Sequence, residues 1–91
     1  DFHHSFIFIK MYYVYILYSR TKDRYYVGYT HNIEIRLSKH NAGATPSTRG
    51  GRPWELVYSE EYIDKSSALF REREIKSKKS RKYIEHLVAK G

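Results

Sequence analysis

The chain has no cysteine among its 91 residues, which excludes both disulfide bonds and thiolate metal sites. This absence fits a reducing compartment, and we expect a cytoplasmic protein. Acidic residues are also scarce, since 10 Asp and Glu stand against 17 Lys and Arg and leave a net charge of +7. So basic a chain favours an anionic partner, with nucleic acid ahead of a membrane surface. The alternative is a lysine-rich surface that only keeps the protein in solution.

Long apolar runs are missing as well. The longest hydrophobic stretch is interrupted by tyrosines and is too short to span a bilayer, so we expect no membrane association. The apolar run at residues 6–9 is too short for a signal peptide. Because Met11 looks like a natural start, we expect residues 1–10 to be an extension outside the fold. Residues 11–91 then form a single small domain.

Tyrosine, in contrast, is abundant: the chain has ten, and most of them fall in two runs at residues 12–18 and 25–29. Aromatic and β-branched residues favour strands, so we predict strands over 12–19 and 25–30 joined by a polar turn. If the turn has an even number of residues, Ser19 pairs with Tyr26 or the register has the same parity. Two sets of side chains then lie on one face of the sheet. The sets are Tyr13, Tyr15 and Leu17, and Tyr26, Gly28 and Thr30.

A helix is predicted to follow the hairpin. Asn32 is a favourable N-cap and Gly43 a helix stop. Between them, Arg36 and His40 lie four residues apart and therefore on one face. The next segment, residues 42–53, is rich in Gly, Pro, Ser and Thr and is expected to be a loop, of a kind that is often functional.

The C-terminal half completes the element order. We predict a third strand over 54–60 and helices over 66–78 and 81–89. Asp64 or Ser66 would cap the first of these helices and Ser80 the second. The order β-β-α-β-α-α predicts an α+β fold, a small three-stranded antiparallel sheet flanked by helices.

Glu72 is the most informative single residue. At about 100° per residue it falls inside the apolar arc that Ala68 and Ile75 mark on the helix over 66–78. A carboxylate on a buried face is costly unless it is paired or metal-bound. Two interpretations stay open: an ion pair with a nearby cation such as Arg36, or a ligand for Mg²⁺, which often takes a single protein carboxylate plus waters.

Four other side chains have two interpretations each. Arg36 could bind a phosphate and stabilise its transition state, or cover apolar groups with its stem. His40 could be a general base or a phosphate contact, or a histidine favoured by the helix dipole. Tyr15 and Tyr26 could transfer a proton or position water, provided that nearby cations lower the pKa of a phenol from about 10. Otherwise they pack as ordinary strand residues.

A basic segment spans residues 71–82, which carry seven Lys and Arg. Such a density of cations suits a phosphate backbone. The alternative is a solvated helix face, and the lack of balancing acids weakens it.

Together these motifs resemble the GIY-YIG endonuclease superfamily, in particular its small stand-alone members, which are similar to the N-terminal nuclease domain of an excinuclease. The family's first motif is matched by residues 13–15, with Tyr15 at its tyrosine, and the second by residues 26–28. Its helix arginine, the histidine of some members and its metal-binding glutamate fall on Arg36, His40 and Glu72. Residues 40–43, 48–49, 53–58 and 72–76 resemble the stand-alone branch.

The likeness covers about residues 12–85, and it includes one departure. Tyr13 occupies the position of the first glycine of the family pattern, which mainly shapes the strand. All polar catalytic positions are retained.

The resemblance implies a Mg²⁺- or Mn²⁺-dependent endonuclease that hydrolyses phosphodiesters of DNA, with RNA as a further substrate, in repair or recombination. Glu72 would hold the metal and Arg36 would neutralise developing charge. Tyr15 would act as base or orient water, with Tyr26 hydrogen-bonded in the same site, and His40 would assist proton transfer or hold the phosphate. Nucleic-acid contacts are expected at Gly28, where no side chain blocks the substrate, and at Arg49, Arg71, Lys76, Lys78 and Lys79.

Two other functions stay open. One is a non-catalytic nucleic-acid-binding module that uses the same basic face and stacking tyrosines. The other is a partner-recruiting domain with a vestigial nuclease site. Retention of Tyr15, Arg36 and Glu72 favours the enzyme. Because the domain has little surface, we expect a protein partner or a second copy to help it grip a duplex.

Overall fold

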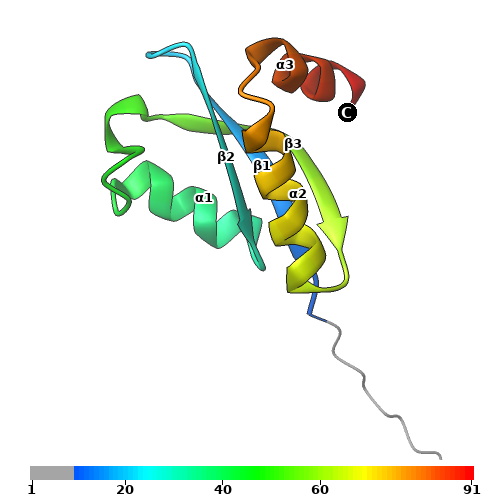
Figure 1. The fold of residues 1–91 in the computed structure, drawn as a ribbon. Coiled ribbons are helices and arrows are strands. Elements are labelled where there is room, and N and C mark those ends of the chain that lie inside the picture. Colours follow the sequence, from blue (N-terminus) through cyan, green and yellow to red (C-terminus); the bar gives the residue numbers. More distant parts are fainter. Residues whose placement is uncertain (1–9) are drawn as a thin grey trace, which may run out of the picture.

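The computed structural model describes residues 10–91, so nearly all of the expected N-terminal extension lies outside the described residues. A three-stranded antiparallel sheet forms the centre of the fold, with strand order β2-β1-β3 (Figure 1). Three helices and a short 3-10 turn complete it, which confirms the predicted α+β class and element order. The elements are β1 (Tyr12–Ser19), β2 (Arg24–Thr30), α1 (Ile33–Ala42), η1 (Arg49–Gly51), β3 (Trp54–Tyr62), α2 (Lys65–Ser77) and α3 (Arg81–Lys90).

The register of the β1–β2 hairpin confirms the predicted shared face. Ser19 pairs with Arg24 and Tyr15 pairs with Gly28, a register of the expected parity. Side chains alternate across a strand, so one face of β1 presents Tyr15 and the other Val14. The parity therefore brings Tyr15 and Tyr26 to the same side of the sheet.

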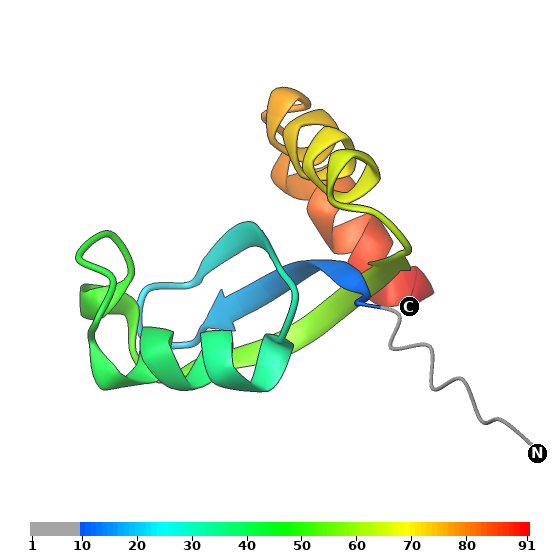
Figure 2. The ribbon, with the colours of Figure 1, turned by 90° about the horizontal axis from the view of Figure 1, so that it is seen from below.

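The sheet separates two layers of helices (Figure 2). On one face, β1 and β3 pack with α1 through a cluster of aromatic and aliphatic residues. On the other face, α2 and α3 cover an aliphatic cluster. The first cluster contains Tyr15, Leu17, Trp54, Tyr26, Ile33 and Leu37, and the second contains Val14, Ile16, Val27, Ala68, Ile75 and Leu87.

Side-chain caps fix where the helices begin. Asn32 Oδ1 accepts a hydrogen bond from the Ile35 amide at 3.0 Å and starts α1 as predicted. Asp64 rather than Ser66 caps α2, because its Oδ1 accepts from the Ser67 amide at 2.7 Å. Ser80 caps α3. No helix of residues 10–91 is long and apolar enough to cross a membrane.

The loop between α1 and β3 folds back on Trp54. The Trp54 indole donates to the Thr48 carbonyl at 2.7 Å, and the Trp54 amide donates to the Asn41 side chain at 2.6 Å. A Cβ on Gly51 would lie 2.4 Å from the indole ring, so only glycine fits where the loop passes it. These contacts hold Thr48 next to His40, near the C-terminal end of α1.

Candidate active site

Tyr15 is the centre of the candidate site. Its hydroxyl lies 3.0 Å from His40 Nε2 and accepts a hydrogen bond from Arg36 Nε at 3.4 Å. Arg36 and His40 project from the same face of α1, as their spacing predicted. Tyr15 is 1% exposed and His40 0%, so these contacts are formed in the interior. Three of the predicted residues therefore meet at one phenol oxygen.

The other ring nitrogen of His40 makes a second polar contact. His40 Nδ1 is 2.8 Å from Thr48 Oγ1, and the Thr48 hydroxyl donates to the Thr45 carbonyl at 3.3 Å. Thr48 is 1% exposed. It was not among the residues predicted for the site, although it lies in the loop that we expected to be functional.

Tyr26 forms the aromatic side of the site. Its ring centroid lies 4.9 Å from that of His40 and 6.3 Å from that of Tyr15. Its phenol also contributes to raising the pKa of Arg36, after the larger contribution of the hydrogen bond to Tyr15. Tyr26 is therefore in the same site as Tyr15, as predicted.

Glu72 lies on α2 and is 9% exposed, as its place in the apolar arc predicted. Its Oε2 accepts from Lys76 Nζ at 3.1 Å, so the predicted ion pair with a nearby cation is present. The cation is Lys76, one helical turn further along α2, and not Arg36. The Lys76 ammonium also lies 5.9 Å from the centroid of the Tyr26 ring. Lys76 thus connects the carboxylate to the aromatic side of the site.

The donor set at Glu72 fits a hard cation that keeps most of its water. Within residues 10–91, the Lys76 ammonium bonds to Glu72 Oε2 and no group donates to Glu72 Oε1. No group of three or more His, Cys, Asp or Glu side chains in residues 10–91 could hold a metal. A single carboxylate plus substrate phosphates is a common arrangement for Mg²⁺, whereas a cage made only of protein ligands is not available here. Of the residues predicted for the site, Glu72 is the carboxylate that could hold such an ion, with its Oε2 now paired with Lys76.

Burial sets the protonation states of the site. It raises the pKa of Tyr15 above its ordinary value, and the hydrogen bond from Arg36 only partly offsets this effect. A catalytic role of Tyr15 was expected to need nearby cations that bring its pKa below the ordinary value. That expectation is wrong, because burial outweighs the effect of Arg36. Burial, and then the charge of Arg36, lower the pKa of His40. At neutral pH the site contains a protonated phenol beside a neutral imidazole.

The structure also gives a different reason for Gly28. Gly28 is buried, and a Cβ there would lie 2.5 Å from the Tyr15 hydroxyl. The glycine accommodates the phenol of the opposite strand, rather than leaving an open surface for the substrate.

Several cations of residues 71–82 are paired with carboxylates. Arg71 donates to both oxygens of Glu60, at 2.9 and 3.1 Å, and to Glu74 at 2.9 Å. Arg81 pairs with Asp23 and Glu85. The expected lack of balancing acids is therefore wrong for both arginines. Lys78 lies over the Tyr83 ring, whereas Lys76 and Lys79 line a hollow beside Tyr26.

Arg49, the remaining predicted nucleic-acid contact, is exposed and its Nε donates to the Gly43 carbonyl at 2.9 Å. This bond joins the C-terminal end of α1 to η1. The guanidinium therefore stabilises the loop from which Thr48 reaches His40.

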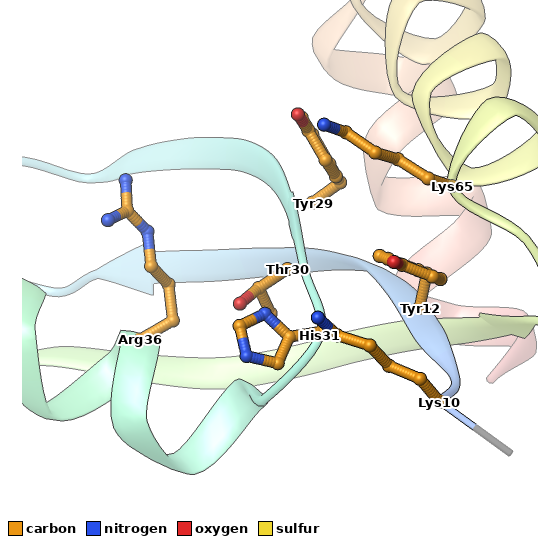
Figure 3. Close-up of a pocket in the computed structure, with 7 residues that line it drawn as sticks. All are labelled: Lys10, Tyr12, Tyr29, Thr30, His31, Arg36 and Lys65. Atoms are coloured by element: carbon orange, nitrogen blue, oxygen red, sulfur yellow. The ribbon is translucent and has the colours of Figure 1, made fainter.

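A cationic pocket of about 410 Å³ adjoins Arg36 (Figure 3). Its residues come from the start of β1, the end of β2, the β2–α1 connection, α1 and the start of α2, and none is acidic. Lys10, His31 and Lys65 were not among the residues predicted for the site, and His31 is exposed. Lys10, Arg36 and Lys65 come together only in the folded chain, which explains why no local pattern indicated them. The lining residues are Lys10, Tyr12, Tyr29, Thr30, His31, Arg36 and Lys65.

Comparison with known proteins supports the resemblance. Residues 11–84 match the family model of the GIY-YIG catalytic domain. A UPF0213 protein of Natronomonas pharaonis is 49% identical over 78 residues, which are 85% of this chain and 89% of that protein. A UPF0213 protein of Staphylococcus haemolyticus is 48% identical over 71% of this chain and 79% of its own length.

A solved structure shows the same similarity. The solution structure of a UPF0213 protein from Bacillus halodurans has a TM-score of 0.56 and 36% identity, covering 87% of this chain and 83% of that one. The UPF0213 names describe no activity.

Proposed function

The chain belongs to the GIY-YIG family of catalytic domains, and we propose that it is a Mg²⁺-dependent endonuclease that hydrolyses phosphodiester bonds of DNA. The observation that carries the proposal is the meeting of Arg36 and His40 at the Tyr15 hydroxyl. A cation and two groups that can exchange protons, brought together at one point, can assist proton transfer from water and stabilise charge on a phosphate.

Each residue has a distinct task in this proposal. Arg36 binds the scissile phosphate and neutralises the charge that grows on it, because only its Nε is used by Tyr15. Tyr15 transfers the proton of the attacking water, and His40 accepts the proton of the phenol. Tyr26 packs against His40 and orients water. Glu72 would hold Mg²⁺ or Mn²⁺, which supplies positive charge at the phosphate and the leaving oxygen when bound.

The neighbouring cations suggest how the substrate strand lies. The cationic pocket continues from Arg36 on one side, and Lys76 and Lys79 line the hollow beside Tyr26 on the other. Backbone phosphates on either side of the scissile bond would contact these two groups. DNA repair or recombination is the process in which such a cut would be used.

A second function is favoured by one observation. The ammonium of Lys76 already neutralises Glu72, as a metal ion would. A domain in which this pair is permanent would bind nucleic acid through the same cations without cutting it. Cleavage assays distinguish the two functions.

The test is cleavage of supercoiled, nicked and branched DNA in Mg²⁺ or Mn²⁺ by the wild type, Glu72→Ala and Arg36→Ala. We expect each variant to lose at least about 100-fold in rate, as when one transition-state donor is removed. Matched controls are Glu61→Ala and Arg73→Ala, which remove exposed side chains of the same charge. A pure wild type that binds DNA and never cuts would support the binding module. If both variants cut like the wild type, the site is wrongly assigned.

A further inference from the structure

We propose that Thr48 is a positioning residue of this site, which holds His40 in the tautomer whose Nε2 accepts the proton of Tyr15. The tautomer follows from the hydrogen bonds of buried groups alone. Its consequence for catalysis rests on the proposed function.

The argument begins with burial. Tyr15, His40 and Thr48 are each at most 1% exposed, so their polar hydrogens depend on protein acceptors. Buried donors without an acceptor are rare in folded proteins. The direction of each bond in the chain can therefore be worked out by assigning every hydrogen.

One direction satisfies every donor. Arg36 Nε–H donates to the Tyr15 oxygen, since a guanidinium has no acceptor. Tyr15 O–H then donates to His40 Nε2, and His40 Nδ1–H donates to Thr48 Oγ1. Thr48 O–H donates to the Thr45 carbonyl. In this arrangement His40 is neutral, with its proton on Nδ1.

The opposite direction leaves a donor without an acceptor. If Thr48 O–H donated to Nδ1, His40 would carry its proton on Nε2 and donate to Tyr15. The Tyr15 oxygen would then receive hydrogens from both Arg36 and His40. Its own hydrogen would then find no acceptor, because His40 and Arg36 are the hydrogen-bond partners of this oxygen within residues 10–91. The complete chain therefore selects the Nδ1–H tautomer.

Thr48 can impose this choice because its own position is fixed. Its carbonyl accepts from the Trp54 indole at 2.7 Å and from the Gly51 amide at 3.1 Å. Its amide donates to the same Thr45 carbonyl at 3.1 Å. With the backbone held on both sides, the hydroxyl stays between His40 and Thr45.

In the proposed hydrolysis, every proton that one group releases is taken up by another. Tyr15 gives its proton to His40 Nε2 and receives one from the attacking water, whose oxygen forms the new bond to phosphorus. The bond to the leaving oxygen breaks, its electron pair stays on that oxygen, and the oxygen takes a proton from solvent. His40, now doubly protonated and bonded through Nδ1–H to Thr48, returns its extra proton through Nε2 to Tyr15, which passes a proton on to solvent. Without the Thr48 acceptor, His40 could carry its proton on Nε2 and would have no lone pair facing Tyr15.

The first test reads the tautomer directly and needs no catalysis. Nitrogen-15 NMR of the imidazoles, with His40 assigned by His40→Gln, should show the proton on Nδ1 and a bare Nε2 in the wild type. Thr48→Val keeps the shape and removes the hydroxyl, and we expect the Nε2–H form to appear. Thr48→Ser should restore the wild-type signals. Ser47→Ala, at an exposed neighbour in the loop, is the matched control.

A wild-type His40 that carries its proton on Nε2 would overturn the inference, even if Thr48→Val failed to fold. So would a folded Thr48→Val variant with unchanged nitrogen signals.

The second test measures cleavage. Thr48→Val should lower kcat by about 10- to 100-fold with little change in KM, since proton transfer commonly contributes about 100-fold or more. Thr48→Ser should recover most of the rate. Equal rates for Thr48→Val and the wild type would refute the positioning role. A wild type that never cleaves would refute the proposed function, and the NMR test would still decide the tautomer.

Discussion

The phenol of Tyr15 lies directly against Gly28, its cross-strand partner, so that a Cβ on Gly28 would be 2.5 Å from the Tyr15 hydroxyl. The hydroxyl has little freedom to move away, because His40 and Arg36 hold it. The smallest residue of β2 therefore determines where the central group of the site lies.

Gly28→Ala should displace the Tyr15 hydroxyl from its partners. We expect a loss of about 1–3 kcal/mol of stability, typical of overpacking, together with loss of cleavage. Thermal unfolding and plasmid cleavage measure the two effects. Gly50→Ala is the control, because nothing lies within 4 Å of a Cβ added there. If Gly28→Ala and Gly50→Ala behaved alike, the close contact with Tyr15 would have no energetic consequence.

His40 should make the stability of the domain depend on pH in a defined window. Burial, and then the charge of Arg36, lower the pKa of His40 below its ordinary value. As the pH falls, the unfolded chain therefore takes up a proton before the folded one does. The stabilisation is complete above about pH 6.5, the unfolded value, and is lost as the pH falls towards the lower folded value.

The measurement is Tm between about pH 7.5 and 5.5. The wild type should lose more Tm over this range than His40→Gln, which has no titrating group at this position. His86→Gln, at an exposed site on α3, should follow the wild type. Parallel curves for the wild type and His40→Gln would show that the buried imidazole is not the titrating group.

The helix and strand boundaries were predictable because local chemistry sets them. Asn32, Asp64 and Ser80 cap their helices through their own side chains, and the hairpin parity follows from a turn with an even number of residues. The partners of the site residues were less predictable. Thr48 reaches His40 only because the loop folds onto Trp54, and that contact has no local signature. The raised pKa of Tyr15 has the same origin, since burial depends on the assembled fold.

Arg71 was predicted to contact nucleic acid, but its ion pair with Glu60 indicates a role in stability. The Arg71 and Glu60 side chains are each 18% exposed, and the hydroxyls of Tyr58 and Tyr62 also donate to Glu60. We expect Arg71→Ala to cost about 2 kcal/mol or more, below the range of about 3–5 kcal/mol for a fully buried pair. Thermal unfolding measures this loss. Arg73→Ala removes an exposed cation of the same helix and should change stability little. A large loss of DNA affinity without loss of stability in Arg71→Ala would support the predicted nucleic-acid contact instead.

The cationic pocket gives a prediction about binding that is separate from catalysis. Lys65 lines it from the start of α2, and Arg36 joins it to the Tyr15 site. If a backbone phosphate occupies the pocket, Lys65→Glu should weaken binding to DNA of any sequence. It should also reduce the slope of log K against log salt by about 1, the contribution of one phosphate contact. Fluorescence anisotropy over a salt series measures both quantities.

Lys90→Glu is the matched control, because it makes the same change of charge at an exposed position on α3 outside the pocket. A general effect of net charge would weaken binding equally in both variants, since each changes the net charge from +7 to +5. A local phosphate contact would affect Lys65→Glu more strongly and would alter its salt slope. Equal affinities and equal slopes for the two variants would therefore exclude the pocket as a phosphate site. That outcome would leave the hollow lined by Lys76 and Lys79 as the remaining path for the strand.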